Sequence, residues 1–487
     1  MNETNRKLVS GLVWSFLETI GPQGVSLVIT IILARLIVPE AYGVIAAAQV
    51  VTSIATTFVT GGFGNALIQK KDADDLDFSS MFIFNTCFSV FVYIIIYFSA
   101  PLFVGILNES YDYELLVKVI RVIGIGIIFA SFNSFYRSVL TKWLQFKKIF
   151  FVTLIGTLIS AVVGIAMAYE GFGVWALVSQ YMVLYIFNTV LFVIFSQWCP
   201  KLMFSFTRLR PLISFGGKLM MSSLLTTVYT NLSSLIIGNQ YDSEDLAYYN
   251  KGINFPKMIV ANIMSAINTA LFPIMVTLKG KEEFKNYVKQ FNQYSMFIIS
   301  PMMFGLAAVS TTFVSLLLTD KWLPCVPFLQ IACLDYAIQP IGIANLQYWK
   351  ASGRATLYLV VDIIKKVIGI GFLIVAVTLK KGAVSIALVA LISSIIAAII
   401  TLYPAKKYID YSILEQIKDI APPFILSAIM CLAVTGLGMI LNTSLLIKLI
   451  LQIMLGIVVY VGGCVIFKVK GFWEIIYFVK FKLRKET

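Results

Sequence analysis

The chain has 487 residues, of which 59% are hydrophobic and only 13% are charged, and its formal net charge is +14. A composition this apolar excludes ordinary soluble multidomain proteins. The positive charge alone could indicate nucleic-acid binding. However, the Lys and Arg residues lie between apolar segments and do not gather on one polar domain, so they favour membrane topology and exclude nucleic acid as the expected partner.

Apolar runs recur along the whole chain, and each is long enough to cross a hydrocarbon core of about 30 Å. They lack the alternating pattern of transmembrane β-strands. The sequence therefore predicts an all-α polytopic membrane protein with about fourteen transmembrane helices. The first apolar run is not followed by the small-residue cleavage site of a signal peptide, so we expect a retained first helix.

Basic residues concentrate in alternate loops, for example at Lys142, Lys147 and Lys148, and again at Lys281 and Lys285. Cytoplasmic loops carry the excess of Lys and Arg in membrane proteins. We therefore expect a bacterial inner-membrane protein with both termini in the cytoplasm. The tail, in which lysines alternate with aromatic residues, is expected to lie on the anionic inner leaflet.

A weak internal repeat is visible at an offset of roughly 205 residues, as expected of a transporter built from parallel repeats. Residues 41–43 (AYG) match residues 247–249 (AYY), and residues 173–178 (GVWALV) match residues 382–389 (GAVSIALV). This pattern predicts two six-helix lobes, residues 1–205 and 206–412, followed by a helix pair and basic tail over residues 413–487. In transporters of this kind the substrate path lies between the halves.

Several short stretches resemble a known family. Residues 33–43 (LARLIVPEAYG), 61–69 (GGFGNALIQ), 248–251 (YYNK) and 271–273 (LFP) resemble polysaccharide transporters of the multidrug/oligosaccharidyl-lipid/polysaccharide exporter superfamily, and most closely its Wzx-like O-antigen and colanic-acid branch. The resemblance implies a V-shaped bundle like that of the related multidrug exporters. It also implies a flippase that moves undecaprenyl-pyrophosphate-linked oligosaccharide from the cytoplasmic to the periplasmic leaflet. Its partners would be that glycolipid, membrane lipids, and polymerase and chain-length proteins.

A pyrophosphate headgroup can cross the hydrocarbon only in a wet cavity that offers fixed cations. Polar and cationic residues inside the predicted spans are therefore the candidates for binding substrate: Lys218, Asn231, Lys251, Asn254, Lys257 and Arg137. For the lysines, the alternative is a side chain that extends to the membrane interface, and for Arg137 that alternative is the favoured one.

Two carboxylates are predicted near the bilayer centre and are candidates for coupling transport to a proton or sodium gradient, with no other cofactor. Glu18 lies four residues before Pro22, which removes the helical donor to the Glu18 carbonyl. Asp335 lies at a similar depth in its own span. Either carboxylate could also serve in structural pairing. A third, Asp362, has Lys366 one helical turn later, and this spacing predicts a structural ion pair.

Other function classes remain as alternatives. A multidrug antiporter would share the lobes and the carboxylates, and a lipid II flippase would need the same cationic cavity. A membrane-bound polymerase or ligase is disfavoured, because the chain has no His and no nucleophile and base at recognisable spacing. The six cysteines lack metal-binding spacing, so no metal site is expected.

Overall fold

The computed structural model describes residues 3–473 except for residues 279, 353, 380 and 470. Over this part of the chain every regular element is helical, and twelve segments are long and apolar enough to cross a membrane. Two further long helices, of 35 and 25 residues, lie outside these twelve. The predicted all-α multi-pass membrane fold is therefore confirmed. Contacts divide the chain into two compact units, Met1–Ala247 and Tyr248–Thr487.

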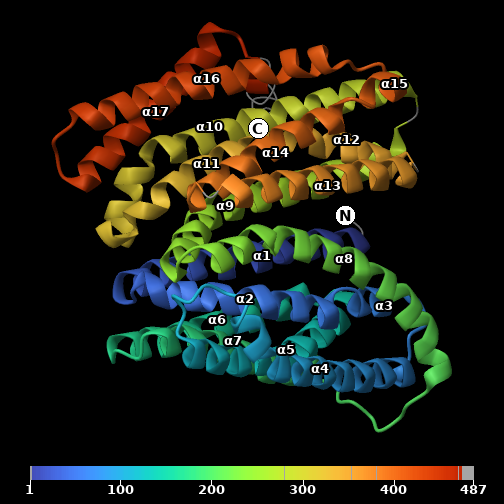
Figure 1. The fold of residues 1–487 in the computed structure, drawn as a ribbon. Helices are drawn as coiled ribbons and strands as arrows, with labels where there is room; N and C mark the ends of the chain where they lie inside the picture. The colour runs from blue at the N-terminus through green and yellow to red at the C-terminus, as the bar shows by residue number, and fades with distance from the viewer. Residues whose placement is uncertain (1–2, 279, 353, 380, 470, 474–487) are drawn as a thin grey trace. The chain divides into compact units, whose positions relative to one another are not determined.

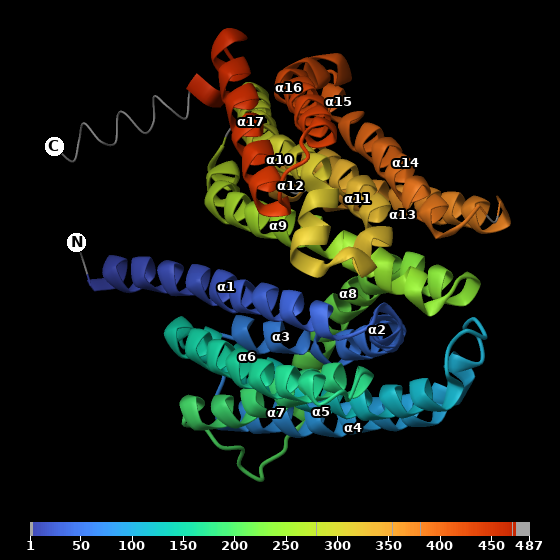
Figure 2. The same cartoon turned by 90° about the vertical axis from the view of Figure 1, so that its left-hand side faces the viewer.

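The first unit is a bundle in which α1 packs on α6, α6 on α7, α4 on α5, and α2 on both α5 and α8 (Figure 1). Its helices are α1 (Glu3–Leu36), α2 (Pro39–Thr60), α3 (Phe63–Gln69), α4 (Asp75–Val104), α5 (Tyr113–Lys142), α6 (Phe146–Tyr169), α7 (Val174–Ser196) and α8 (Phe206–Gln240). The helix α1 continues through Pro22. An irregular linker, residues 197–205, connects α7 to α8 and is visible as an open loop in Figures 1 and 2.

Glycine allows α8 to approach α3 closely. A Cβ atom on Gly62 would lie 2.1 Å from the backbone oxygen of Gly216, and one on Gly216 would lie 2.8 Å from Phe63 Cδ1. Such separations are far below van der Waals contact, so a side chain at either position would push the two helices apart. The glycine pair therefore fixes which face of α8 meets the rest of the first unit.

The second unit is built around the long helix α10, which packs on α11, α16 and α17. Its helices are α9 (Ser243–Thr277, which starts in the first unit), α10 (Lys281–Leu318), the 3-10 helix η1 (Asp320–Cys325), α11 (Val326–Ile338), α12 (Pro340–Ala351), α13 (Ala355–Leu379), α14 (Ala383–Leu402), α15 (Ala405–Ile409), α16 (Ile413–Ile440) and α17 (Leu445–Ile466). Both views show α13 and α14 as a hairpin (Figures 1 and 2).

One predicted span of the second unit is not a continuous helix. Residues 320–349 form a single apolar span, but α11 ends at Ile338 and α12 begins at Pro340. Proline lacks the N–H that would continue the ladder, so the carbonyl four residues earlier loses its donor. Interrupted helices at membrane depth are typical of the ion and substrate sites of transporters.

Candidate transport site

The two sequence-predicted residues Glu18 and Arg137 are brought together in the first unit. Arg137 Nη2 on α5 donates a hydrogen bond to Glu18 Oε1 on α1, and the two side chains form an ion pair. The Glu18 side chain is 7% exposed and that of Arg137 is 51% exposed. Arg137 lies five residues before the end of α5, or about 8 Å along the axis. Glu18 therefore lies at that level, nearer one end of α5 than its middle.

A hydrogen-bond network one turn from Arg137 holds α5 against α7. Thr189 Oγ1 donates to Asn133 Oδ1 at 2.8 Å, and Asn133 Nδ2 donates to the backbone oxygen of Tyr185 at 3.2 Å. Asn133 precedes Arg137 by four residues and shares its helix face. The network thus orients the stretch of α5 that presents the guanidinium to Glu18.

Two hydroxyl side chains of α8, Ser223 and Thr227, face α2 and the residue that follows it. Thr227 Oγ1 lies 3.1 Å from Thr57 Oγ1, and Ser223 Oγ donates to the Gly61 carbonyl at 3.2 Å. Asn231 Nδ2 donates back to the Thr227 carbonyl at 2.8 Å, so this amide is satisfied within its own helix. These residues contribute to packing within the first unit.

Lys218 points away from that interface. It follows Gly216 by two residues, which is about 200° around the helix, and its side chain is exposed. No ion pair involving Lys218 is present in the described part of the chain. Lys218 is therefore an exposed cation about three turns into an α-helix that begins at Phe206.

The two lysines of α9 have opposite environments. Lys251 is 5% exposed, and its Nζ lies 4.8 Å from the ring centroid of the fully buried Trp322. Six residues later, on a different face, Lys257 is exposed, as is Asn254. A cation above an indole face is stabilised electrostatically. Lys251 is therefore held inside the second unit, whereas Asn254 and Lys257 lie on its surface.

Asp335, in the last turns of α11, is the second predicted coupling carboxylate. Its Oδ2 accepts a hydrogen bond from Gln339 Nε2 at 3.4 Å, and the carboxyl also interacts with the Ser394 hydroxyl on α14. Its Oδ1 is buried without a hydrogen-bond partner among the described residues. No cationic side chain forms an ion pair with this carboxyl within the same part of the chain.

A cavity of about 230 Å³ lies in the second unit next to the break between α11 and α12, and it is lined in part by Gln339 and Ser394, the two neighbours of Asp335. Gln339, Lys365, Ser394 and Thr401 supply its polar lining. The cavity is large enough for several waters. The sequence prediction did not include Gln339 and Ser394 as neighbours of Asp335. Pro340 in the middle of a predicted span was nevertheless an indication of an interrupted helix, and such interruptions are typical of transport sites.

Asp362 and Lys366, the last of the predicted residues, form an ion pair within one helix. Lys366 Nζ lies 2.8 Å from Asp362 Oδ2, one turn apart on α13. Neither side chain is fully exposed. No cluster of three or more His, Cys, Asp or Glu side chains that could hold a metal ion occurs among the described residues.

The polysaccharide biosynthesis protein family model matches residues 32–327. The chain belongs to this family. Lipopolysaccharide biosynthesis protein WzxC of Escherichia coli is 25% identical to it over 448 residues, which cover 90% of this chain and 89% of WzxC. Teichuronic acid biosynthesis protein TuaB of Bacillus subtilis is 23% identical over 446 residues, covering 90% of each chain.

Solved structures of low sequence identity share the fold of this family member. The lipid II flippase MurJ in an inward closed conformation superposes with a TM-score of 0.75 at 18% identity, covering 94% of this chain and 98% of MurJ. An inward-facing multidrug transporter of the MATE family gives a TM-score of 0.62 at 14% identity, covering 79% of this chain and 94% of that one. The chain is thus a polysaccharide biosynthesis family protein with the fold of these transporters.

Proposed function

We propose that the protein is a flippase that moves undecaprenyl-pyrophosphate-linked oligosaccharide units across the bacterial inner membrane, with both termini in the cytoplasm. The observation that carries this proposal is membership of the polysaccharide biosynthesis protein family, together with relatives named for lipopolysaccharide and teichuronic acid biosynthesis. Such a flippase would deliver its substrate to a polymerase and chain-length proteins, and it needs no catalytic residue of its own.

Exposed cations support an anionic substrate. Lys218 and Lys257 are exposed on long helices, and neither forms an ion pair within the described residues. A bare ammonium inside a membrane is costly unless water or an anion meets it. We propose that each of these lysines, on its own unit, contacts an anionic group of the substrate, and that Asn254 contacts the sugars. Lys251 and Asn231 serve packing, because both already have partners within the protein.

The coupling carboxylate that we propose is Asp335. It has an unpartnered oxygen, and its neighbours Gln339 and Ser394 line a cavity, so it could take up a proton or a sodium ion without breaking an existing ion pair. Protonation of Glu18 would instead leave Arg137 without its partner. We therefore assign Glu18 and Arg137 to holding α1 against α5, and Asp335 to the ion gradient.

Deletion of the gene tests the function directly. We expect undecaprenyl-linked oligosaccharide to accumulate on the cytoplasmic face of the membrane, detected by its inaccessibility to a periplasmic ligase. No accumulation, with export unchanged, would exclude flipping of this substrate. Complementation of a MurJ-depleted strain would indicate lipid II as substrate, and a change limited to drug resistance would indicate a multidrug antiporter.

Single substitutions test the headgroup assignment. Lys218→Ala and Lys257→Ala should each reduce export about tenfold or more at unchanged protein levels, because one hydrogen bond to a charged group contributes roughly 1.5–3 kcal/mol. Lys381→Ala is the matched control, since Lys381 is an exposed lysine in the short connection between α13 and α14. Equal export by all three variants would show that neither Lys218 nor Lys257 contributes to substrate binding.

A further inference from the structure

Arg354, in the connection between α12 and α13, lies against aromatic rings. Its guanidinium carbon is 3.9 Å from the ring centroid of Tyr408 in α15 and 6.0 Å from that of Tyr348 in α12. Its backbone N–H donates to the Trp349 carbonyl at 2.8 Å. An aromatic face stabilises a guanidinium without neutralising its charge. The cation is therefore held in place at the start of α13.

A second cation lies near the same ring. Lys407 Nζ is 5.8 Å from the ring centroid of Tyr408, and the preceding Lys406 is also exposed. Arg354, Lys406 and Lys407 form no ion pair within the part of the chain that the structure describes. Positive charges held this close repel each other unless an anion lies with them. We call Arg354, Lys407 and Tyr408 the basic site, and it lacks a counter-charge.

The acidic residues nearby in the sequence are already paired with α10. Three ion pairs connect them to that helix: Lys281 with Asp410 at 3.8 Å, Lys285 with Glu415 at 3.4 Å, and Lys289 with Asp419 at 2.9 Å. Each of these acids thus has its own lysine. Among the described residues, no carboxylate pairs with a cation of the basic site.

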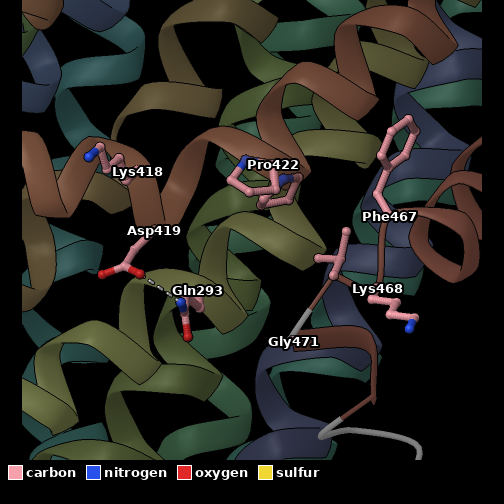
Figure 3. Close-up of a pocket in the computed structure, with 9 residues that line it drawn as sticks. Gln293, Lys418, Asp419, Pro422, Phe467, Lys468 and Gly471 are labelled. Carbon is pink, nitrogen blue, oxygen red and sulfur yellow. Dashed lines mark hydrogen bonds between the residues drawn. The ribbon is translucent and has the colours of Figure 1, made fainter.

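Asp419 is also oriented by neutral groups. Gln293 Nε2 donates to its Oδ1 at 3.2 Å, and the Tyr411 hydroxyl donates to its Oδ2 at 2.7 Å. Figure 3 shows the carboxyl turned toward Gln293, while the amino groups of Lys418 and Lys468 point away from it. Lys418 is exposed and does not belong to the basic site. It therefore provides a matched control for the loss of one surface charge.

An apolar strip runs along α14 toward the basic site. Its exposed side chains recur every three or four residues, which places them on one helix face. They are 41–72% exposed: Leu388, Ile392, Ile395, Ile399 and Tyr403. Tyr403 lies three residues before Lys406. Because α13 and α14 pack as a hairpin (Figure 1), the basic site lies at the end of the hairpin where α13 begins and α14 ends.

We propose that the basic site binds the phosphate group of an anionic phospholipid, whose acyl chains lie along the exposed apolar side chains of the hairpin. Arginine N–H groups form paired, charge-assisted hydrogen bonds to phosphate oxygens. With the termini in the cytoplasm, this end of the hairpin faces the cytoplasmic leaflet, which carries anionic lipids. The proposal concerns a lipid that stays bound to the protein and does not depend on which substrate is flipped.

The apolar strip favours a lipid over a soluble anion. A free phosphate would meet the cations alone, whereas a phospholipid also contacts the apolar face that leads to them. Arg354 should contribute most, because its position is fixed before the lipid binds and little side-chain freedom is lost. Lys407 is exposed, and an exposed ion pair contributes less. The phosphate would connect the start of α13 with α15.

Lipid binding to the purified full-length protein tests the proposal. Dissociation constants of phosphatidylglycerol and of phosphatidylcholine with the same acyl chains are measured in detergent by native mass spectrometry. Inorganic phosphate and glycerol 3-phosphate are titrated as soluble anions. The variants are Arg354→Gln, Arg354→Lys, Lys407→Gln and the control Lys418→Gln, and the thermal midpoint of each is measured without lipid.

The unsubstituted protein should bind phosphatidylglycerol at least about tenfold more tightly than phosphatidylcholine. Arg354→Gln should weaken phosphatidylglycerol binding about tenfold or more and leave phosphatidylcholine unchanged, because it removes a hydrogen bond between charged groups. Arg354→Lys should retain part of the preference, since the charge stays and the paired geometry is lost. Lys407→Gln should weaken binding about threefold, and Lys418→Gln should have no effect.

Three results would overturn the proposal. Equal affinity for the two lipids would mean that negative charge is not recognised. Equal losses in Arg354→Gln and Lys418→Gln would mean that the lipid responds only to the overall charge of the protein. Soluble phosphate bound as tightly as phosphatidylglycerol would exclude the lipid as the preferred source of the phosphate group. If Arg354→Gln lowers the lipid-free midpoint, the exposed Lys407→Gln decides, and unchanged phosphatidylglycerol binding there would reject the site.

Discussion

Each unit has a carboxylate in a membrane-spanning helix, fully buried at Glu18 and partly buried at Asp335, and the two carboxylates have different partners. Glu18 in the first unit is met by the guanidinium of Arg137. Asp335 in the second unit has one unpartnered oxygen, and its neighbours are a neutral amide and a hydroxyl that line a cavity. Burial of a carboxylate alone therefore does not indicate ion coupling. Whether a carboxylate can couple transport to an ion depends on its partner. A carboxylate paired with a cation is already stabilised as an anion, whereas an unpaired one is free to bind a cation or a proton.

The largest effect should come from breaking the pair of the first unit. Arg137→Ala leaves Glu18 buried without a cation. Removal of one partner of a buried pair costs about 3–5 kcal/mol, and the half-exposed Arg137 places the expected loss of unfolding free energy near 3 kcal/mol. The measurement is the thermal midpoint of the purified protein in detergent.

A double-mutant cycle isolates the interaction between the two groups. Glu18→Gln combined with Arg137→Gln removes both charges, so much of the loss seen in Arg137→Ala should be recovered. Additive effects of the two single substitutions would mean that Glu18 and Arg137 contribute independently, and the contrast with Asp335 would then disappear.

The second-largest effect concerns the close contact between Gly62, at the start of α3, and α8. Gly62→Val places a side chain where a Cβ atom would lie 2.1 Å from the Gly216 carbonyl oxygen, so we expect a loss of about 2 kcal/mol from overpacking. Gly217→Ala is the control, because a Cβ atom there has no neighbour within 4 Å and alanine favours the helix by up to about 1 kcal/mol. Equal midpoints for the two variants would mean that α8 is not held at Gly62.

How far the sequence predicts such features depends on the separation of the partners along the chain. The pair Asp362 and Lys366 follows from spacing, since residues four apart share a helix face. The pair Glu18 and Arg137 spans 119 residues, and no local rule joins them. The all-α membrane fold was predictable because each span carries its own apolar run. The contacts of Asp335 were not, because Ser394 comes from another helix.

The two lysines of α9 also show that contacts between residues far apart in the sequence cannot be predicted from local spacing. Both Lys251 and Lys257 are cations in one helix, and periodicity places them on different faces without indicating which face is buried. The buried face is the one with Lys251, because its ammonium packs on the ring of Trp322 inside the second unit. Trp322 lies 71 positions after Lys251 in the sequence. Sequence patterns thus give the candidates, whereas long-range packing sorts them into structural residues and exposed ones.

The third prediction tests the unpaired carboxylate itself. Asp335→Asn should reduce ion-driven export at least about tenfold, equivalent to 1.4 kcal/mol, because the amide cannot gain and lose a proton. Its thermal midpoint should stay unchanged or rise, since a partly buried charge without a cation costs stability. A fall in midpoint like that of Arg137→Ala, with export retained, would make Asp335 a structural residue like Glu18.

The smallest effect should be a dependence on pH at the N-terminus of α4, which Asp74 caps. Asp74 accepts a hydrogen bond from the backbone N–H of Asp77 and lies beside Arg208, and these contacts lower the pKa of its carboxyl. A carboxyl whose pKa is lower in the folded protein stabilises it above the unfolded pKa of about 3.9. That stability is lost as the pH falls through the lower folded value. Thermal midpoints between pH 6 and pH 3 should therefore fall less for Asp74→Asn, which keeps the cap without titrating, than for the unsubstituted protein. Identical slopes would show that the charge of Asp74 contributes nothing to the stability of the folded protein.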